Sequence, residues 1–151
     1  AFADFSWETG PVTLSFGGRL DRWSIRNGFL RESTLGTGAA LTNSRFPDRT
    51  SWEPTGRAGL AWRATDAISL RAAAYTGWRL PTLNELYRPF RVGADATAAN
   101  AALAPERLRG AELGLEVRPA ETVRLALTTF ENRLHNAIAN VTVVRGPGTF
   151  P

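Results

Sequence analysis

The side chains best suited to contact a ligand lie in one stretch, residues 78–106, between two segments of alternating pattern. Four of them are the candidate ligand contacts: Arg79, Tyr87, Arg88 and Arg91. Guanidinium and phenol groups donate hydrogen bonds to oxyanions, so this set suits an anionic or catecholate ligand. A second interpretation is that the same side chains brace a long loop against its neighbours. The sequence leaves both interpretations open.

Nothing in the sequence indicates catalysis or a resident metal. The chain has no Cys and one His, His135, and a lone imidazole is more often a structural or surface group than a ligand. Glu112 and Glu116 share the polar side of one predicted strand, which is typical of lumen charges rather than an acid–base pair. There is no Ser/His/Asp arrangement and no Gly-rich phosphate loop. We therefore predict that the protein is not an enzyme and has no cofactor.

The charge pattern argues against a nucleic-acid partner. The 18 basic residues are all arginine and face 14 acids, giving a net charge of +4 and a pI of about 10.9. They are spread along the chain, without a run of five basic residues, so paired or solvated arginines are expected instead of a nucleic-acid surface.

No apolar run reaches the ~18 residues of a membrane helix. Because the chain also lacks Met, we expect it to be part of a longer protein.

Alternation of apolar and polar residues predicts the strands that position these groups. Six strands are expected, at about residues 12–22, 52–63, 68–78 and 109–118, from residue 122 onward, and at about 137–144. Short turns near residues 10, 65 and 120 separate long loops near 24–50 and 79–107. Each strand would have one apolar and one polar face. The polar face would carry charged residues, among them Arg19, Asp21, Glu53, Arg57, Arg71, Glu112, Glu116 and Arg124.

The tryptophans give a length scale for the apolar face. Trp52 and Trp62 lie ten residues apart on it, which at ~3.3 Å per residue and a tilt near 45° spans roughly 23 Å. An outer-membrane barrel has an apolar band about 25 Å tall between two aromatic girdles. Trp78 falls at the height of Trp52 on the next strand. The spacing therefore predicts an aromatic girdle formed by Trp52, Trp62 and Trp78.

Short turns at one end and long loops at the other are typical of a barrel in the outer membrane. We predict an all-β fold: a fragment of an antiparallel transmembrane β-barrel with about six strands, in contact with outer-membrane lipid. The alternative is a soluble all-β ligand-binding module that buries its apolar face, because alternation by itself does not separate the two.

Three motifs resemble those of TonB-dependent outer-membrane receptors. Residues 78–87, Trp-Arg-Leu-Pro-Thr-Leu-Asn-Glu-Leu-Tyr, resemble the family's Phe-Arg-Ala-Pro-Thr-X-X-Glu-Leu-Tyr. Residues 100–106, Asn-Ala-Ala-Leu-Ala-Pro-Glu, with Glu112 and Gly114 following, resemble Asn-Pro-X-Leu-X-Pro-Glu…Glu-X-Gly. Residues 128–132 resemble the strand and Phe-X-Asn that come next. Trp at 78 and Ala at 101 depart from the family's Phe and Pro, and the order of the motifs is kept.

The resemblance implies that residues 1–151 are part of a 22-stranded barrel domain, with the plug domain outside this chain. The implied activity is TonB-dependent active transport of a scarce nutrient, of ferric siderophore or cobalamin type, across the outer membrane of a Gram-negative bacterium. The implied partners are the TonB energy-transducing protein, reached through the plug, and a small-molecule nutrient. Haem receptors of the family carry a His between the first two motifs, and residues 82–99 contain none, which disfavours haem. A passive porin-like barrel is a further alternative.

Overall fold

The computed structural model describes residues 1–92 and 95–142, without the side chains of Arg91 and Asp95. The chain forms two compact units. The sheet unit consists of Ala1–Asp21, Trp52–Trp78 and Arg107–His135, and the loop unit consists of Arg22–Ser51, Arg79–Glu106 and Asn136–Pro151.

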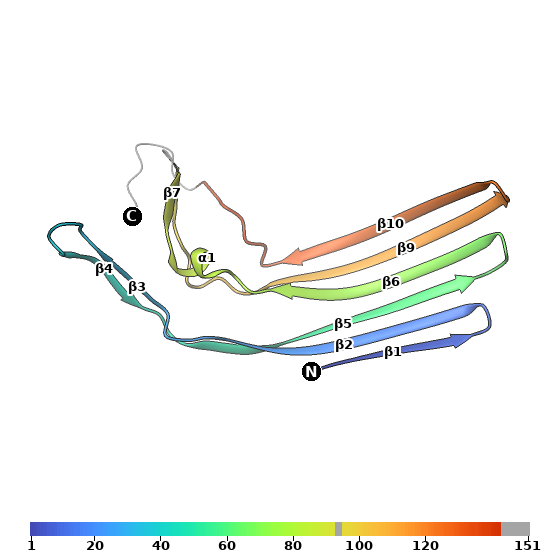
Figure 1. Cartoon of the computed structure of the whole chain (residues 1–151), viewed down its shortest axis with the longest axis horizontal. Coiled ribbons are helices and arrows are strands. Elements are labelled where there is room, and N and C mark those ends of the chain that lie inside the picture. The colour runs from blue at the N-terminus through green and yellow to red at the C-terminus, as the bar shows by residue number, and fades with distance from the viewer. Residues whose placement is uncertain (93–94, 143–151) are drawn as a thin grey trace. The chain divides into compact units, whose positions relative to one another are not determined.

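The sheet unit is built on six antiparallel strands in the order β1-β2-β5-β6-β9-β10 (Figure 1). The strands are β1 Phe2–Thr9, β2 Val12–Ile25, β5 Arg49–Arg63, β6 Ile68–Arg79, β9 Glu106–Ala120 and β10 Val123–His135. Three short turns join β1 to β2, β5 to β6 and β9 to β10 at the same end of the sheet (Figure 1). The predicted all-β, antiparallel fold of about six strands is confirmed, and the sheet is open rather than closed into a barrel.

One strand of the six-stranded sheet was missed by the sequence pattern. Strand β1 pairs with β2 along its whole length, with Phe5 opposite Phe16. Its sequence hides the alternation because Phe2 shares a face with Asp4 rather than with Phe5. A short segment with one such exception does not stand out from a loop.

The predicted strand over residues 137–144 is wrong for residues 137–142, which form no strand, and 143–144 lie outside the described residues. The extended chain ends at Asn136, whose φ of 55° is left-handed and incompatible with a strand. The Asn136 side chain donates to the Pro105 carbonyl, and the Ile138 N–H donates to Glu106 Oε1 at 2.6 Å. These contacts hold the segment against the start of β9, so its apolar, β-branched composition does not decide its conformation.

One face of the sheet is apolar and exposed, and we call it the apolar face. The register places apolar residues opposite each other on it, as in Trp62 with Leu70 and Leu127 with Leu115. Its exposed members are Phe5, Trp7, Phe16, Leu20, Leu60, Trp62, Ile68, Leu70, Leu113, Leu115, Leu125 and Leu127. In water, an uncovered row of this size would be unfavourable, and in lipid it is what a barrel wall requires.

The opposite face, the polar face, is lined by ion pairs. The Arg57 guanidinium on β5 reaches across β2 to Asp4 on β1, with an N–O distance of 2.8 Å. It passes over Gly17, where a Cβ atom would collide with both side chains. Tyr75 repeats this arrangement: it lies over Gly110 of β9 and its hydroxyl donates to Asn132 on β10 at 3.1 Å. Glycine on the middle strand thus allows one side chain to brace three strands.

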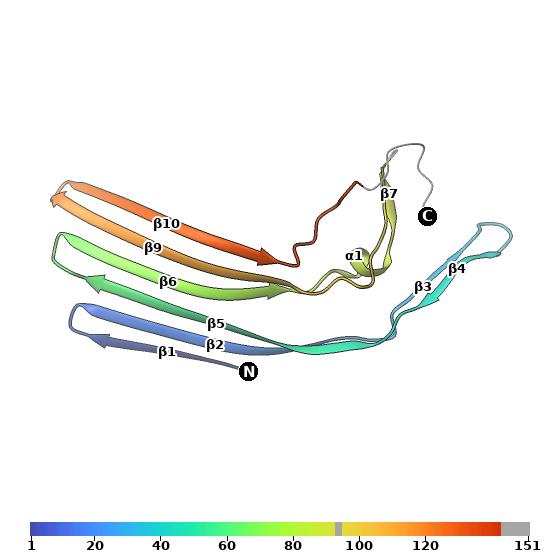
Figure 2. The same ribbon diagram turned by 180° about the vertical axis from the view of Figure 1, so that it is seen from behind.

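The loop unit contains the remaining elements. These are β3 Phe29–Ser33, β4 Ala40–Arg45, the helix α1 Leu83–Tyr87, β7 Phe90–Val92 and β8 Asp95–Thr97. Strands β3 and β4 form a two-stranded hairpin in the region predicted as a long loop (Figure 2), and β7 pairs with β8 in a second two-stranded sheet. Among the described residues of this unit, the buried apolar side chains other than proline are Trp23, Ile25, Leu86 and Tyr87.

Among the described residues, no helix is long and apolar enough to cross a membrane.

Candidate ligand-binding site

Helix α1 is short because its sequence encodes both a start and a stop. The Thr82 hydroxyl accepts the Glu85 N–H at 3.3 Å, and Glu85 Oε2 accepts the Thr82 N–H at 2.6 Å. This reciprocal pair is a capping box, which satisfies backbone donors that the first turn leaves free. Pro89 restricts Arg88 to an extended conformation, so the helix ends at Tyr87.

Arg79 joins the helix to the neighbouring segments. Its guanidinium forms ion pairs with Glu85, at 3.1 Å, and with Glu106. Two arginines, Arg79 and Arg88, lie near Glu85 in the sequence, and in the structure Glu85 pairs with Arg79. Since Glu106 also accepts the Ile138 N–H, the Arg79 node (Arg79, Glu85, Glu106) connects the end of β6, α1, the start of β9 and the segment after β10. This geometry matches the bracing interpretation of Arg79.

The Arg79 guanidinium, and after it the Thr82 N–H, lower the pKa of Glu85 from 4.5 to about 2. A lowered pKa means that the ionised carboxylate stabilises the folded loop above pH 4.5, and that this stabilisation is lost as the pH falls toward 2. We expect Glu85→Gln to lower the Tm of the full-length protein at pH 7. The difference from wild type should shrink below pH 4.5, because Gln keeps the cap but not the charge. Thermal unfolding in detergent between pH 7 and pH 3 tests this, and a pH-independent difference would contradict it.

The other predicted ligand contacts lie in different environments. Tyr87 is buried, with its ring centroid 4.5 Å from that of Phe46. Arg88 is exposed, and its guanidinium has no hydrogen bond or ion pair to any described residue. Arg91 lies in β7, and its side chain is outside the described part of the structure. Ligand contact by Arg79, Tyr87, Arg88 and Arg91 stays a prediction. Arg79 and Arg88 are both exposed, but the Arg79 guanidinium is already paired with Glu85 and Glu106.

Arg49 is an organising residue that sequence reasoning missed. Its guanidinium donates to the carbonyls of Ala101 and Leu103, at 2.9 and 2.8 Å, and lies 5.8 Å from the centroid of the Trp23 ring. It therefore fastens the start of β5 to the segment before β9. More than 50 residues separate the partners, so no local spacing could have revealed the contact.

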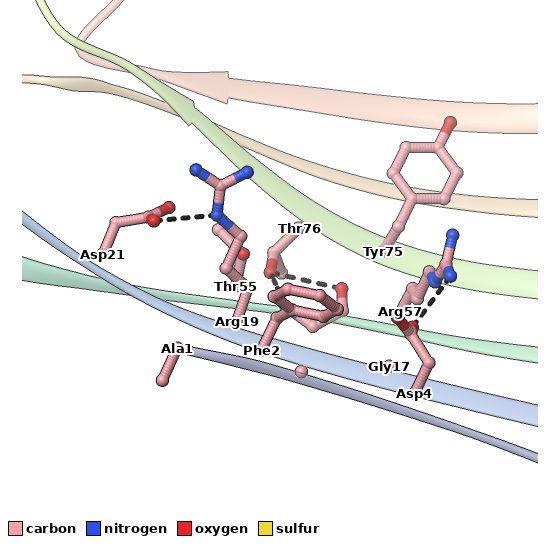
Figure 3. A pocket seen from close by; sticks show the side chains of 12 residues that line it. Ala1, Phe2, Asp4, Gly17, Arg19, Asp21, Thr55, Arg57, Tyr75 and Thr76 are labelled. Atoms are coloured by element: carbon pink, nitrogen blue, oxygen red, sulfur yellow. Dashed lines mark hydrogen bonds and ion pairs between the residues drawn. The ribbon is translucent and has the colours of Figure 1, made fainter.

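The polar face has a hollow of about 680 Å³. Arg19 and Asp21 pair on its wall at 2.7 Å, and Arg57 and Asp4 pair beside Tyr75 (Figure 3). Because its guanidinium groups are compensated by these carboxylates, the hollow offers little net charge to an ionic ligand.

The three girdle tryptophans differ in environment. Trp78 is half-buried and its Nε1 donates to Asp21 at 3.2 Å, so it contacts the polar face and departs from the predicted alternation. Regular pairing of β5 with β6 ends just before Thr76, whose hydroxyl instead accepts a backbone N–H of β5 at 2.9 Å. The other two are exposed, Trp52 by 56% and Trp62 by 42%. Their place in a girdle stays a prediction.

An antiparallel sheet with an exposed apolar face, a charged opposite face and short turns at one end defines the wall of a transmembrane β-barrel. The chain belongs to the TonB-dependent receptor family, since the family model described as TonB dependent receptor-like, beta-barrel matches residues 1–151.

Two solved structures share this fold. One is a double mutant of the Serratia marcescens hemophore receptor HasR in complex with its hemophore HasA and heme, with a TM-score of 0.66 and 22% identity over 88% of this chain and 24% of that one. The other is the copper transporter OprC, with a TM-score of 0.65 and 21% identity over 87% of this chain and 20% of that one. This chain thus spans a quarter or less of their lengths. A search among curated proteins found no significant match.

Proposed function

We propose that this chain is a segment of the barrel wall of a TonB-dependent transporter in the outer membrane of a Gram-negative bacterium. The observation that carries the proposal is the two-faced sheet: apolar side chains are exposed on one face while ion pairs line the other. A soluble module would have to bury the apolar face, and the described residues place nothing over it. Membership of the family supports the same conclusion.

The proposed partners follow from this place in the barrel. Outer-membrane lipid contacts the apolar face. The energy for transport comes from TonB, through a plug domain that we assign to the rest of the longer protein. Residues 1–151 then form a partial barrel domain, a transporter segment without enzymatic activity.

The proposed cargo is a scarce nutrient of ferric siderophore or cobalamin type, with iron uptake as the first possibility. The absence of His from residues 82–99 disfavours haem as the cargo. Arg88 and Arg91 are the proposed cargo contacts, because Arg88 is exposed on the loop that the Arg79 node holds in place. Arg79 and Tyr87 are proposed to position this loop.

Fractionation of cells that express the full-length protein tests the proposal. We expect outer-membrane protein that resists urea and carbonate washes and shifts on a gel after boiling. Release into the soluble fraction without a shift would refute the barrel. Uptake of a ferric siderophore should then stop when TonB is deleted, whereas uptake that continues would favour a passive porin-like channel.

A further inference from the structure

The net charge of the chain lies entirely in the loop unit. The sheet unit contains nine arginines and nine acids, so the remaining nine of the 18 arginines face only five of the 14 acids in the loop unit. Two of those acids, Glu85 and Glu106, are already bound by Arg79. The loop unit is therefore electropositive, which raises the local concentration of anions around it.

Part of this charge is concentrated on one face of the β3–β4 hairpin. The register pairs Phe29 with Arg45 and Arg31 with Asn43, and directly opposed residues share a face. Arg31 and Arg45 are consequently diagonal neighbours, a relation that brings Cβ atoms within about 7–8 Å of each other. We call these four residues the hairpin face.

The two guanidinium groups of the hairpin face are exposed and uncompensated. Within the described ranges, the guanidinium groups of Arg31 and Arg45 have no hydrogen bond or ion pair, and both residues are exposed. The hairpin's own acid, Glu32, pairs with Thr42 and belongs to the opposite face. Two like charges held as diagonal neighbours repel each other, and a two-stranded hairpin has little stability to spare. An anion bound between them would remove the repulsion.

Two uncharged side chains next to these arginines offer further contacts to a ligand. Phe29 is 69% exposed and offers an apolar ring beside Arg45, while Asn43 offers an amide donor beside Arg31. Two guanidinium forks bind paired negative oxygens with directional, charge-assisted hydrogen bonds. An exposed ring next to them suits the flat or apolar part of the same ligand.

We propose that the hairpin face is an anion-binding site for a ligand with neighbouring negative oxygens: carboxylate, catecholate or phosphate. As a site for cargo it rests on the proposed transport function, and it lies on a different loop from Arg88 and Arg91. The same chemistry is available from two sources, a soluble anion or a phosphate-bearing lipid headgroup of the outer leaflet.

Purified full-length protein carrying Arg31→Gln and Arg45→Gln tests the site. The probes are citrate and 2,3-dihydroxybenzoate, measured by calorimetry at low salt, and vesicles containing lipopolysaccharide, measured by co-sedimentation. Loss of two charge-assisted contacts should lower the affinity for the probe by roughly tenfold or more. Lys at both positions should restore only part of the affinity, because it keeps the charge but not the fork. The charge-matched control is Arg63→Gln with Arg109→Gln, two exposed arginines of the sheet unit.

Weaker binding of the soluble anions identifies cargo as the source, and weaker binding of the vesicles alone identifies lipid. Equal losses in the control pair, or no loss in the Arg31/Arg45 pair, would overturn the proposal. A gel shift on boiling verifies that each variant is folded. If the protein proves not to be a transporter, uptake fails while anion binding by the hairpin face persists, so the two failures are distinguishable.

Discussion

Arginine in place of Leu127 is expected to block assembly of the full-length protein in the outer membrane. Leu127 is 70% exposed on the apolar face, opposite Leu115, and lies within β10 between the β9–β10 turn and the middle of the strand. An arginine that faces lipid near the bilayer midplane costs about 2–4 kcal/mol. The measurement is the fraction of protein that resists urea extraction and shifts on boiling, which should fall several-fold.

The matched control is Ala126→Arg, on the adjacent residue of the same strand. Ala126 lies opposite Glu116, which already pairs with Arg118 and Arg124. Its side chain therefore belongs to the polar face, where an added guanidinium meets ion pairs and water instead of lipid. We expect this variant to assemble normally. Equal assembly of the two variants would contradict the assignment of the faces, and with it the membrane function.

The faces of the sheet could be predicted because a strand has a period of two, and the alternation is long in β2, β5, β6 and β9. The hairpin β5–β6 follows directly from two such segments and a short turn. The register confirms the predicted faces of Arg57 and Trp62, since Arg57 lies opposite Tyr75 on the polar face and Trp62 lies opposite Leu70 on the apolar face. Local pattern is sufficient wherever one face must be apolar over the full length of a strand.

The predictions that failed did so because of contacts between residues that are distant in the sequence. Residues 137–142 have the composition of a strand, but contacts to Pro105 and Glu106 and the left-handed Asn136 hold them in another conformation. Trp78 departs from its predicted face where the pairing of β5 with β6 becomes irregular. Neither effect can be read from residue types, because each depends on a partner that is distant in the sequence.

The candidate site also contains features that local sequence predicted and features that depend on residues distant in the sequence. The motif over residues 78–87 indicated an ordered loop, and a partner for Glu85 could be proposed from charge and proximity alone. The partners of Arg49 could not be proposed in this way, because its two acceptors are backbone carbonyls, which any residue provides. The hairpin β3–β4 was hidden because both of its faces mix apolar and polar residues, so it has no alternation to detect.

Alanine in place of Leu86 is expected to release the loop of residues 79–106 without unfolding the sheet. Leu86 is 1% exposed, the largest fully buried side chain among the described residues. Its truncation removes contacts and leaves a cavity, which typically costs about 2–5 kcal/mol. The loop unit has few other buried apolar side chains to compensate. Limited proteolysis of the full-length protein should therefore show new cleavage within residues 79–106.

Leu83→Ala is the control, because it makes the same chemical change in the same helix at a side chain that is 67% exposed. A surface substitution of this kind is expected to stay within about 0.5 kcal/mol. Since β6 and β9 do not depend on Leu86 for their pairing, both variants should keep the gel shift on boiling. Cleavage that is equal in the two variants would show that the loop does not rest on a core centred at Leu86. A lost shift in Leu86→Ala alone would show that the loop and the sheet unfold together.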